Sequence, residues 1–444
     1  MSRMTARNHH ITGATSAGIA ASIEGEIREG RFQPGAALPT VRSLASDLGV
    51  STATVADAYR ALRLRGIVRT HGRRGTTVAE RPPLSWAWAP TLPAPGLRNL
   101  VDGNPDSKLL PPLSRMLAKA GGHALYGDPR KLPELVNVAL KQLQAEGVPA
   151  TDVAVVGGAT DGIGRVLEAH LAPGDAVGVE DPTFPPLLDL LRALGLVPVP
   201  IELDDRGPLP DSAEAALRRG IDALVVTTRA QNPTGAAVDA ARSQELKRLL
   251  RSHRDLLVIE DDTGGVATDD PLHSLLDGSG SRWAFVRSFS MIFGPDLRTA
   301  VVAADEVTLS RVEGRQWVGS MWVSHILQRL AWMLLTDKPT TARVRQARRT
   351  YARRRATLVD ALARHGIESP SRSGFHVWIP VAQEASAIAA LQAARWAVAA
   401  GEPFRLQSPP GIRVTASRMG PADAESFAID LASALRARIA TSSG

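Results

Sequence analysis

The sequence predicts two parts: a small helix-turn-helix domain with a wing, followed by a large α/β domain with a mainly parallel sheet. Three observations predict this architecture. Apolar residues repeat at helical spacing between residues 19 and 62, and short apolar strands alternate with helical patterns between residues 153 and 303. Residues 1–82 carry twelve arginines and six acidic residues, so they hold +6 of the chain's net charge of +7. This basic segment predicts a module that binds a polyanion, with a solvated basic arm as the alternative.

The composition suits a globular protein of two or three domains, because the chain has 444 residues, of which 44% are hydrophobic. It contains no cysteine, which excludes disulfides, thiolate metal sites and a cysteine nucleophile. No apolar secretory segment is visible near the start, and the most apolar long stretch, 316–335, contains His325, Gln328 and Arg329. We therefore expect a cytoplasmic protein with no membrane span and no bound metal.

Three helices and two strands are predicted before residue 80. Ile19, Ile23 and Ile27 repeat every four residues and mark one helix with an apolar stripe. Thr40 and Ser51 are the expected N-caps of two further helices, which a short glycine turn joins. The stretch IVRTHGRRGTTV reads as two short strands around a basic turn. Two helices joined by a glycine turn and followed by such a wing predict a DNA-binding domain.

The stretch LPTVRSLASDLGVSTATVADAYRALRLRGIVRTHGRRGT resembles the winged-helix domain of GntR-type regulators, over residues 14–79. The resemblance implies that the helix after GVS enters the major groove of double-stranded operator DNA. It assigns six residues to DNA binding: Arg42, Ser51, Thr52, Thr54, His71 and Gly72. Arg42 would neutralise a phosphate or bind guanine, and short hydroxyls at a helix start can bond phosphates. At Thr52 the sequence departs from the family, which usually has arginine at this position. The alternatives to DNA contact are that Arg42 is an ordinary surface charge and that Thr54 only starts the helix.

The large segment after residue 100 alternates helical patterns with six short apolar strands. These strands are Val153–Val156, Ala176–Val179, Ala223–Val226, Leu256–Ile259, Trp283–Val286 and Ala300–Ala303. Four motifs follow strands: VVGGATDGIG, DALVVTTRAQNPTG, LLVIEDDTGG and FVRSFSMIFGPDLRTAVVA. Sites in α/β folds lie where strand C-termini meet helix N-termini, so we expect the functional site at this edge of the sheet.

In their order and spacing, these motifs resemble the fold-type I, pyridoxal-phosphate-dependent aminotransferases. With the N-terminal domain, the chain resembles the MocR-type fused regulators over residues 14–435. The domains expected are a disordered arm (1–13), the winged helix-turn-helix domain (14–79), a Pro- and Ala-rich linker (80–99) and a transferase-like domain (100–440) with a small C-terminal α+β subdomain (340–440). The resemblance implies a head-to-tail homodimer, in which Tyr126 of YGDP reaches the partner subunit's phosphate.

The resemblance also implies where a cofactor phosphate would bind. Gly158, Ala159 and Thr160 match the turn whose backbone amides hold that phosphate. Ser288 and Arg298 match the serine and arginine that contact it. A helix N-terminus beside small residues suits an anion for physical reasons as well.

Other residues match those that contact the cofactor ring and the substrate. Phe184 matches the aromatic that stacks on the pyridine ring, and Asn232 matches the side chain that bonds the ring hydroxyl. Asp261 matches the carboxylate that pairs with the pyridinium nitrogen, with the adjacent Asp262 as the alternative. Arg413 matches the arginine that binds a substrate carboxylate.

One position departs from the family in a way that affects chemistry. The lysine that forms the Schiff base follows the second serine of SFS, and here Met291 stands there while the following PDLR keeps the register. A thioether cannot form an imine or relay protons in transamination. Thr263 replaces the tyrosine expected near the ring hydroxyl, Lys131 replaces a glycine and Val136 replaces an arginine. Among the six lysines, Lys131 is the nearest candidate for a substitute amine, and a surface charge is its alternative.

The sequence therefore predicts a DNA-binding transcription regulator whose aminotransferase-like half dimerises and senses a small effector without catalysis. No covalent pyridoxal phosphate is expected; noncovalent binding of this cofactor or its amine form, or of another effector, stays open. The alternatives are an active aminotransferase with an appended DNA-binding domain and a dimerisation scaffold without effector. The run of seven arginines over 343–355 reads as a solvated helix face, with a second DNA track as the alternative.

Overall fold

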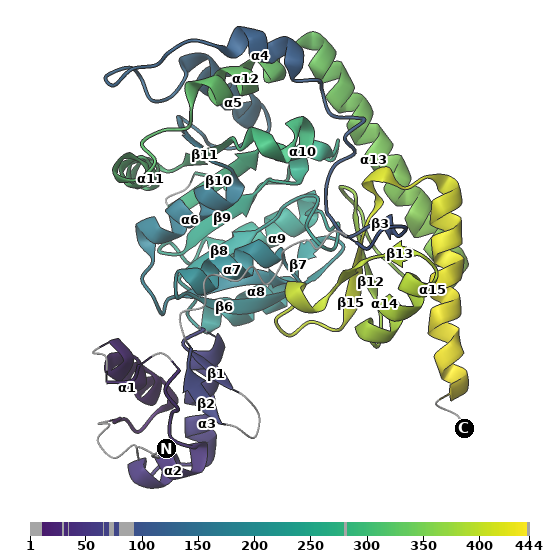
Figure 1. The fold of residues 1–444 in the computed structure, drawn as a ribbon. Helices are drawn as coiled ribbons and strands as arrows, with labels where there is room; N and C mark the ends of the chain where they lie inside the picture. The colour runs from purple at the N-terminus through teal and green to yellow at the C-terminus, as the bar shows by residue number, and fades with distance from the viewer. Residues whose placement is uncertain are drawn as a thin grey trace. The chain divides into compact units, whose positions relative to one another are not determined.

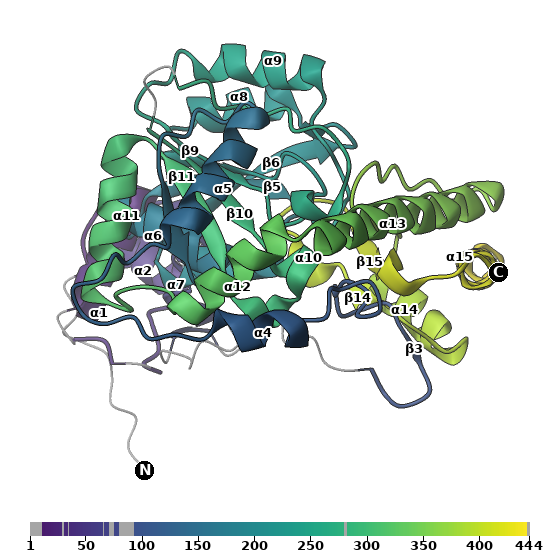
Figure 2. The same ribbon diagram turned by 90° about the horizontal axis from the view of Figure 1, so that it is seen from above.

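The computed structural model describes residues 11–28, 31–33, 35–64, 66–70, 75–79, 93–278 and 282–441. The chain divides into two compact units, one built mainly from residues 1–87 and the other from most of residues 88–444. Both are drawn in Figure 1 and, from above, in Figure 2. Each unit is described by itself below.

The N-terminal unit is a winged helix-turn-helix. Its helices are α1 (Ser16–Arg28), α2 (Val41–Leu48) and α3 (Thr52–Leu64), and its antiparallel wing strands are β1 (Val68–Thr70) and β2 (Thr76–Val78). Helices α1 and α2 pack on α3 around a core that includes Ile19, Ile23, Val55 and Leu62. Because these apolar residues recur at helical spacing, each helix has one apolar face, and that face packs into the core.

Side chains at both ends of the turn hold the helix-turn-helix. The hydroxyl of Thr40 accepts a hydrogen bond from the Ser43 amide at the start of α2, and Gly49 ends that helix with a left-handed φ of 66°. The hydroxyl of Ser51 accepts from the Thr54 amide (3.1 Å) at the start of α3. The predicted caps and the glycine turn are therefore confirmed.

The second unit contains a large, mostly parallel sheet with helices around it. Its strands run in the order β4-β11-β10-β9-β8-β5-β6-β7, where β11 is antiparallel to both neighbours and β7 adds a two-residue edge. They are β4 (Val153–Val156), β5 (Ala176–Asp181), β6 (Val197–Asp204), β7 (Gly207–Pro208), β8 (Ala223–Val226), β9 (Leu257–Asp261), β10 (Arg282–Ser288) and β11 (Ala300–Ala304). Strands β5, β8, β9 and β10 are parallel, so their carboxyl ends meet at one edge.

Helices surround this sheet, and some of them connect its strands (Figures 1 and 2). They are α4 (Ser114–Ala120), α5 (Pro133–Ala145), α6 (Ala159–His170), α7 (Pro185–Ala193), α8 (Pro210–Arg218), α9 (Ala240–Leu250), α10 (Ser290–Phe293), α11 (Glu306–Val318) and α12 (His325–Thr336). Gly162 of α6 lies so close to the sheet that an added Cβ would stand 2.8 Å from the Val302 side chain. Glycine therefore permits the close approach of α6 to the strands that carry the site.

A smaller subdomain at the C-terminal end packs a three-stranded antiparallel sheet, in the order β12-β15-β14, against helices. Its elements are α13 (Lys338–Arg364), β12 (His376–Pro380), α14 (Glu384–Ala393), β13 (Trp396–Ala397), β14 (Ala399–Ala400), β15 (Gly411–Thr415) and α15 (Pro421–Thr441). Strand β3 (Arg98–Asn99) pairs in parallel with β13. Short 3₁₀ turns are η2 (Gly265–Ala267), η3 (Pro295–Leu297), η4 (Glu402–Phe404) and η5 (Ala416–Arg418).

The architecture agrees with the prediction of a winged helix-turn-helix and a fold-type I α/β domain with a mainly parallel sheet. All six strands predicted in the large sheet are present, within two residues at each end. The sequence analysis did not predict β6, whose stretch VPVPIELD is interrupted by two prolines. The last two residues of the predicted linker, Arg98 and Asn99, form β3 of the small subdomain. Of the predicted arm (1–13) and linker (80–99), residues 1–10 and 80–92 lie outside the described residues.

Candidate functional site

The first candidate site is the start of α3 in the N-terminal unit. Arg42, Ser51 and Thr52 are exposed, and Thr54 is half-buried. The hydroxyls of Ser51 and Thr54 lie 2.8 Å apart, so each is also engaged in starting the helix. Exposed hydroxyls and an arginine around a helix N-terminus suit phosphate oxygens. The other two predicted DNA contacts, His71 and Gly72, lie outside the described residues.

The second candidate site lies at the carboxyl edge of the large sheet. Gly158 precedes α6 with a φ of 117°, and Ala159 and Thr160 form the first turn of that helix. Arg298 reaches this turn and donates to the Gly157 carbonyl (2.9 Å). A Cβ on Gly158 would stand 2.4 Å from the Arg298 guanidinium, so only glycine leaves room for it. Backbone amides, the helix dipole and a guanidinium thus converge on one point, which is an anion site in physical terms.

Ser288 is the last residue of β10, and Met291 belongs to the short helix α10 that follows. The buried hydroxyl of Ser288 is 2.9 Å from that of Ser290. Met291 is half-buried, and its side chain packs against a small apolar cluster that includes Tyr351 and Phe375. An unbranched thioether suits such an irregular apolar surface. The position that the resemblance assigns to the lysine therefore carries a packed apolar side chain.

Asp261 ends β9 and carries a carboxylate without an ion pair to any described residue. It accepts hydrogen bonds from the Thr263 amide (2.8 Å) and hydroxyl (2.5 Å). Burial raises the pKa of Asp261 to about 6, and the charge of Asp262 adds to the shift, while the two bonds from Thr263 oppose it. A cationic group placed beside this carboxylate would favour its charged form.

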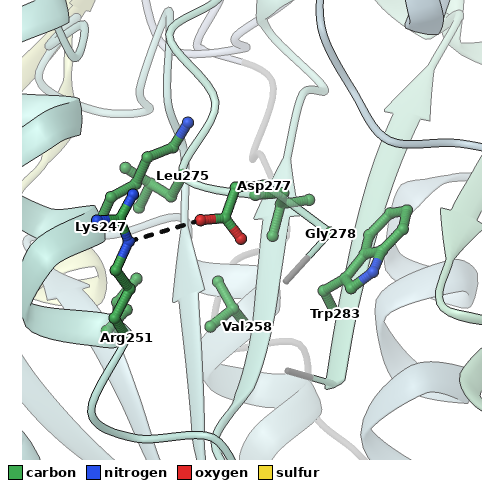
Figure 3. A pocket seen from close by; sticks show the side chains of 9 residues that line it. Lys247, Arg251, Val258, Leu275, Asp277, Gly278 and Trp283 are labelled. Atoms are coloured by element: carbon green, nitrogen blue, oxygen red, sulfur yellow. Dashed lines mark ion pairs between the residues drawn. The ribbon is translucent and has the colours of Figure 1, made fainter. Parts of the chain in front are cut away.

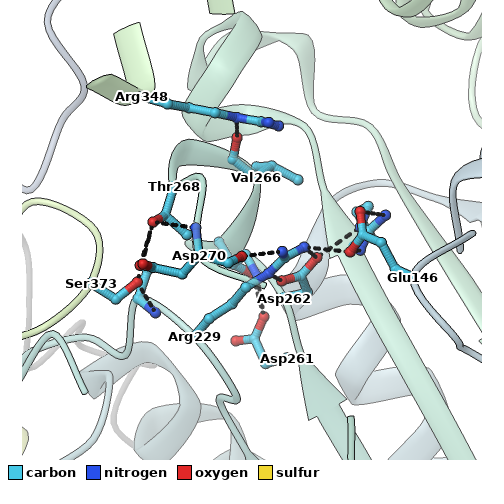
Figure 4. Close-up of polar contacts among 12 residues, drawn as sticks. Glu146, Arg229, Asp261, Asp262, Val266, Thr268, Asp270, Arg348 and Ser373 are labelled. Carbon is cyan, nitrogen blue, oxygen red and sulfur yellow. Dashed lines mark hydrogen bonds and ion pairs between the residues drawn. The ribbon is translucent and has the colours of Figure 1, made fainter. Parts of the chain in front are cut away.

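Asp262, in contrast, is fully buried between two arginines. Figure 4 shows its contacts: it accepts from Arg229 (2.8 Å) and Arg287 (2.7 Å), and both arginines also pair with Glu146 (2.8 Å each). Although burial alone would raise the pKa of Asp262, Arg287 and Arg229 hold it below its ordinary value. Asp262 is thus committed to this network. Of the two adjacent carboxylates, Asp261 is the one that remains available to a ligand.

Arg413 of β15 is fully buried and reaches towards Asn232. Its guanidinium donates to the Asn232 side chain (3.4 Å) and to the Val101 carbonyl. An added Cβ at Gly103 would lie 3.2 Å from the same guanidinium. The segment 101–103 therefore covers the arginine that the sequence analysis assigned to a ligand carboxylate.

The two aromatic residues predicted to lie in the site, Phe184 and Tyr126, differ in their exposure to solvent. Phe184 follows β5 and is half-buried, and the amide of the preceding Thr183 donates to the Phe404 carbonyl (2.8 Å). Tyr126 is 82% exposed and touches Trp322 edge-on, with ring centroids 5.7 Å apart. Within the part of the chain that the structure describes, Trp322 rather than another predicted site residue is the ring partner of Tyr126.

Lys131 is held by carboxylates. Its ammonium lies 2.6 Å from Asp152 and 2.8 Å from Glu313. Burial would lower the pKa of Lys131, but these two carboxylates raise it above the ordinary value. A lysine that stays protonated is a poor nucleophile. The geometry therefore argues against Lys131 as a substitute amine.

The arginines of α13 have structural partners. Arg348 donates to the Val266 carbonyl (2.9 Å), Arg354 to Asp106 (2.9 Å) and Arg355 to the Gly374 carbonyl (2.8 Å). All three are half-buried, because α13 packs against α12 and η2 of the large domain and against η5, β12 and α15 of the small subdomain. The interpretation of the run as a solvated helix face is therefore wrong for these three residues.

Two hollows lie away from the predicted site residues. The one in Figure 3 has a volume of about 30 Å³, room for a water molecule rather than an effector. It is lined by Lys247, Leu250, Arg251, Val258, Leu275, Leu276, Asp277, Gly278 and Trp283. The second measures about 250 Å³ and is lined by Pro129, Arg130, Lys131, Val155, Glu313, Gln316, Met321 and Trp322.

Both domains of the chain are similar to known protein families. The family model "Aminotransferase class I and II" matches residues 99–430, and "Bacterial regulatory proteins, gntR family" matches residues 15–78. The chain is 37% identical, over 96% of its length and 99% of the relative, to the "Vitamin B6 salvage pathway transcriptional repressor PtsJ" of Salmonella typhimurium. The chain belongs to the MocR-type transcription regulators.

Two more similarities extend the comparison. The "HTH-type pyridoxine biosynthesis transcriptional regulator PdxR" of Corynebacterium glutamicum is 27% identical over 80% of this chain and 81% of the relative. The multiple substrate aminotransferase of Thermococcus profundus matches the fold with a TM-score of 0.71 and 18% identity, over 78% of this chain and 93% of that one. This MocR-type regulator thus binds DNA through its GntR domain, and its second domain has the aminotransferase fold. No described helix is long and apolar enough to cross a membrane.

The sequence analysis missed a residue that shapes the site of this MocR-type regulator. Asp181, at the end of β5, accepts hydrogen bonds from the amides of Leu406, Gln407 and Ser408 and from the Ser408 hydroxyl. It thereby fastens a loop of the small subdomain to the carboxyl edge of the large sheet. The signal was present in the EDPTF motif, where the sequence analysis used only Phe184.

Proposed function

We propose that the aminotransferase-like domain of this regulator binds a small effector without converting it. The effector is a phosphorylated B6 vitamer, pyridoxal phosphate or pyridoxamine phosphate, held noncovalently. The observation that carries the proposal is Met291. It occupies the position of the Schiff-base lysine in the family motif, while Asn232, Asp261 and Arg298 match residues that hold the cofactor in the family.

Without the lysine the domain cannot form a Schiff base or transaminate, but the residues that contact the cofactor noncovalently are still present. A thioether has no amine to attach to an aldehyde and no proton to transfer. Lys131, the nearest alternative, is paired with Asp152 and Glu313. The domain therefore recognises its ligand through noncovalent contacts alone.

The phosphate end of a vitamer fits the turn before α6. Gly158, Ala159 and Thr160 offer the helix N-terminus, and the guanidinium of Arg298 lies against Gly158. Ser288 adds a buried hydroxyl close by in the motif. These are the groups that a phosphate dianion requires.

The ring end fits Asp261, Thr263, Asn232 and Phe184. The carboxylate of Asp261 is raised in pKa and lacks an ion pair with a described residue, so a pyridinium nitrogen would supply the missing positive charge. When bound, the ring supplies an electron sink. The residues of this chain then bind and orient the ring, since Met291 stands at the position of the family lysine.

The names of the relatives support the effector class. PtsJ is named for the vitamin B6 salvage pathway and PdxR for pyridoxine biosynthesis. PtsJ matches nearly the whole of this chain. We extend the vitamer connection from these two proteins to this regulator.

We further propose that the chain acts as a head-to-tail homodimer, with domains at 14–79 and 100–440 joined by a linker at 80–99. Support comes from large apolar side chains that are exposed on α4, α11, α12 and the loop before α5. They are Leu117, Leu125, Tyr126, Trp317, Val318 and Ile326. Exposed apolar side chains of this number are typical of a subunit interface. In such a dimer Tyr126 would reach the partner subunit's phosphate site.

The test is a fluorescence-anisotropy titration of the chain on DNA from upstream of its own gene, with and without pyridoxal phosphate. We expect salt-sensitive, sequence-selective binding whose affinity changes by about fivefold or more when the vitamer is added. Pyridoxamine phosphate, which has no aldehyde, should act as well if covalent attachment is not needed. An unchanged affinity with both vitamers, and with a wider metabolite panel, would favour a scaffold without effector.

The competing function is an active aminotransferase with an appended DNA-binding domain. It requires an amine that attaches the cofactor. Purified protein that is yellow, and that borohydride converts to a covalent phosphopyridoxyl adduct, would support the competing function over ours.

A further inference from the structure

The long helix α13 carries arginines on two different faces. It has 27 residues and runs from the large domain to the small subdomain (Figures 1 and 2). One face packs inward through buried residues such as Val344, Ala347 and Tyr351. Four of the seven arginines over 343–355 donate to partners inside the protein: Arg343, Arg348, Arg354 and Arg355. The other three lie on the opposite face.

These three arginines form a stripe along the outer face of α13. Arg345, Arg349 and Arg353 are exposed and follow one another at intervals of four residues. Residues at this interval lie on one side of a helix, about 6 Å apart along its axis. Across the described ranges, none of their guanidinium groups forms an ion pair or a hydrogen bond within the chain. We call these three residues the α13 stripe.

No acidic residue of the same helix neutralises the α13 stripe. Residues 338–359 include eight basic residues and no aspartate or glutamate. Like charges four residues apart on a helix repel one another and destabilise it. Residues 83–444 as a whole have a net charge of only +1, so positive charge is concentrated on this helix rather than spread over the domain. Such a concentration of charge indicates a surface for an anionic partner.

The chemistry of the α13 stripe favours a phosphate backbone as this partner. All three residues are arginines, whose planar guanidinium can bind a phosphate through two parallel hydrogen bonds. The stripe extends about 12 Å along the helix axis, and each strand of B-DNA carries a phosphate about every 3.4 Å of its axis. The large hydrophobic side chains that are exposed in the described part of the chain all lie on other elements. The face therefore offers no apolar anchor for a membrane or for the core of a protein interface.

We propose that the α13 stripe is a second DNA-binding surface, which contacts the phosphate backbone of duplex flanking the segment bound by the GntR domain. The GntR domain binds DNA on the same chain, so the second contact forms at a high effective concentration of phosphate. A contact to phosphates alone adds affinity and no sequence preference. The inference goes beyond the proposed function and does not depend on the effector.

The test measures the affinity of the full chain, with no vitamer added, for two duplexes that share the sequence-selective upstream site. One duplex has about 20 base pairs, enough for two half-sites one helical turn apart, and the other has about 80 base pairs. We expect the wild type to bind the longer duplex about tenfold more tightly. The slope of log affinity against log salt should be steeper by about 2 to 3 on the longer duplex, because each phosphate contact adds about 0.9.

Removal of the α13 stripe should abolish this dependence on length. The stripe variant carries three substitutions: Arg345→Gln, Arg349→Gln and Arg353→Gln. It should bind the two duplexes with affinities within about twofold of each other and keep the wild-type affinity for the short one. Because the substitutions remove repulsion between exposed like charges, the unfolding midpoint should not fall. Normal binding of the short duplex also shows that the variant is folded.

A matched control separates the position of the charge from its amount. The control variant removes the same charge from exposed arginines of α9 and the turn after it: Arg248→Gln, Arg251→Gln and Arg254→Gln. It should keep the full difference in affinity between the long and the short duplex.

Three results would overturn the inference. In the first, the wild type binds both duplexes with equal affinity and an equal salt slope. In the second, the stripe variant keeps the length dependence, or weakens both duplexes by the same factor. In the third, the stripe variant and the control variant lose the length dependence equally, which would show an effect of net charge alone.

Discussion

Met291 and Asp261 are the residues on which the distinction between recognition and catalysis depends. Met291 packs against the apolar cluster around Tyr351, and the Asp261 carboxylate at the end of β9 accepts two hydrogen bonds from Thr263. In our proposal, Met291 removes the chemistry of the family, whereas Asp261 keeps a carboxylate for the cofactor ring. Each can be tested by a single substitution.

Met291→Lys should restore covalent attachment of the cofactor. The new ammonium would lie at the position from which the family lysine acts, and the proposed phosphate and ring contacts are unchanged. After incubation with pyridoxal phosphate and borohydride, denaturing mass spectrometry should show the phosphopyridoxyl adduct on this variant. Met291→Leu, which keeps the apolar packing, should stay unmodified. Absence of an adduct on the lysine variant would mean that the pocket no longer accepts the cofactor.

Asp261→Asn should change stability in a pH-dependent way. The folded-state pKa of about 6 lies above the ordinary value of 3.8, so ionisation of Asp261 disfavours the folded state. The destabilisation is absent below pH 4 and complete above pH 6. At pH 7.5 the asparagine variant should be more stable than the wild type by up to about 3 kcal/mol, and near pH 4 the two should be equal. Urea unfolding across this pH range measures the difference.

The exposed Asp255 provides the control for that experiment. Asp255→Asn should leave the free energy of unfolding within about 0.5 kcal/mol at every pH. An Asp261→Asn variant that is less stable than the wild type at pH 7.5 would contradict a buried carboxylate whose ionisation disfavours the folded state.

Strand ends and helix N-termini position the site, and these elements follow from the sequence. Buried apolar runs such as Val153–Val156 and Ala223–Val226 predict parallel strands, and the motifs after them mark one edge of the sheet. The network of Asp262 could not be predicted in this way. Glu146, which pairs with the same two arginines as Asp262, lies more than a hundred residues before it and follows helix α5 with no motif around it. Likewise, the partners of Arg348 and Arg354 depend on the tertiary packing of α13.

Asp262→Asn should therefore be strongly destabilising. It removes the charge that Arg229 and Arg287 share in the interior, and a buried ion pair that loses one partner typically costs about 3–5 kcal/mol. Asp269→Asn is the matched control, because Asp269 is half exposed and lies 3.5 Å from Arg348. It should cost less than about 1 kcal/mol. Guanidinium unfolding followed by tryptophan fluorescence gives both values, and similar losses for the two variants would contradict this account.

At the scale of the whole molecule, charge assigns DNA binding to one end of the chain. Residues 1–82 hold nearly all of the excess positive charge. Arg42→Ala should weaken binding to the upstream DNA about tenfold and reduce the slope of log affinity against log salt by about one, as expected for a phosphate contact. Arg251→Ala, an exposed arginine of the second unit, should change neither quantity. An unchanged salt slope for Arg42→Ala would show that this arginine does not contact a phosphate.

Both halves of the molecule were predictable because each carries an ordered series of motifs. The winged-helix pattern and the strand-end motifs are local in sequence. The fastening of segment 101–103 over Arg413, and of Asp181 to the loop at 406–408, joins residues more than 200 positions apart. Only the folded chain brings these together, and this is where the C-terminal subdomain meets the predicted ligand.

The central claim is that this regulator recognises its ligand and does not convert it. The most direct measurement is a transamination assay on the wild-type chain with pyridoxal phosphate and a panel of amino acids, in which the formation of pyridoxamine phosphate is followed by chromatography. The account predicts no pyridoxamine phosphate above the level formed in protein-free buffer. Formation of one equivalent per chain, or repeated turnover with a 2-oxo acid, would contradict it.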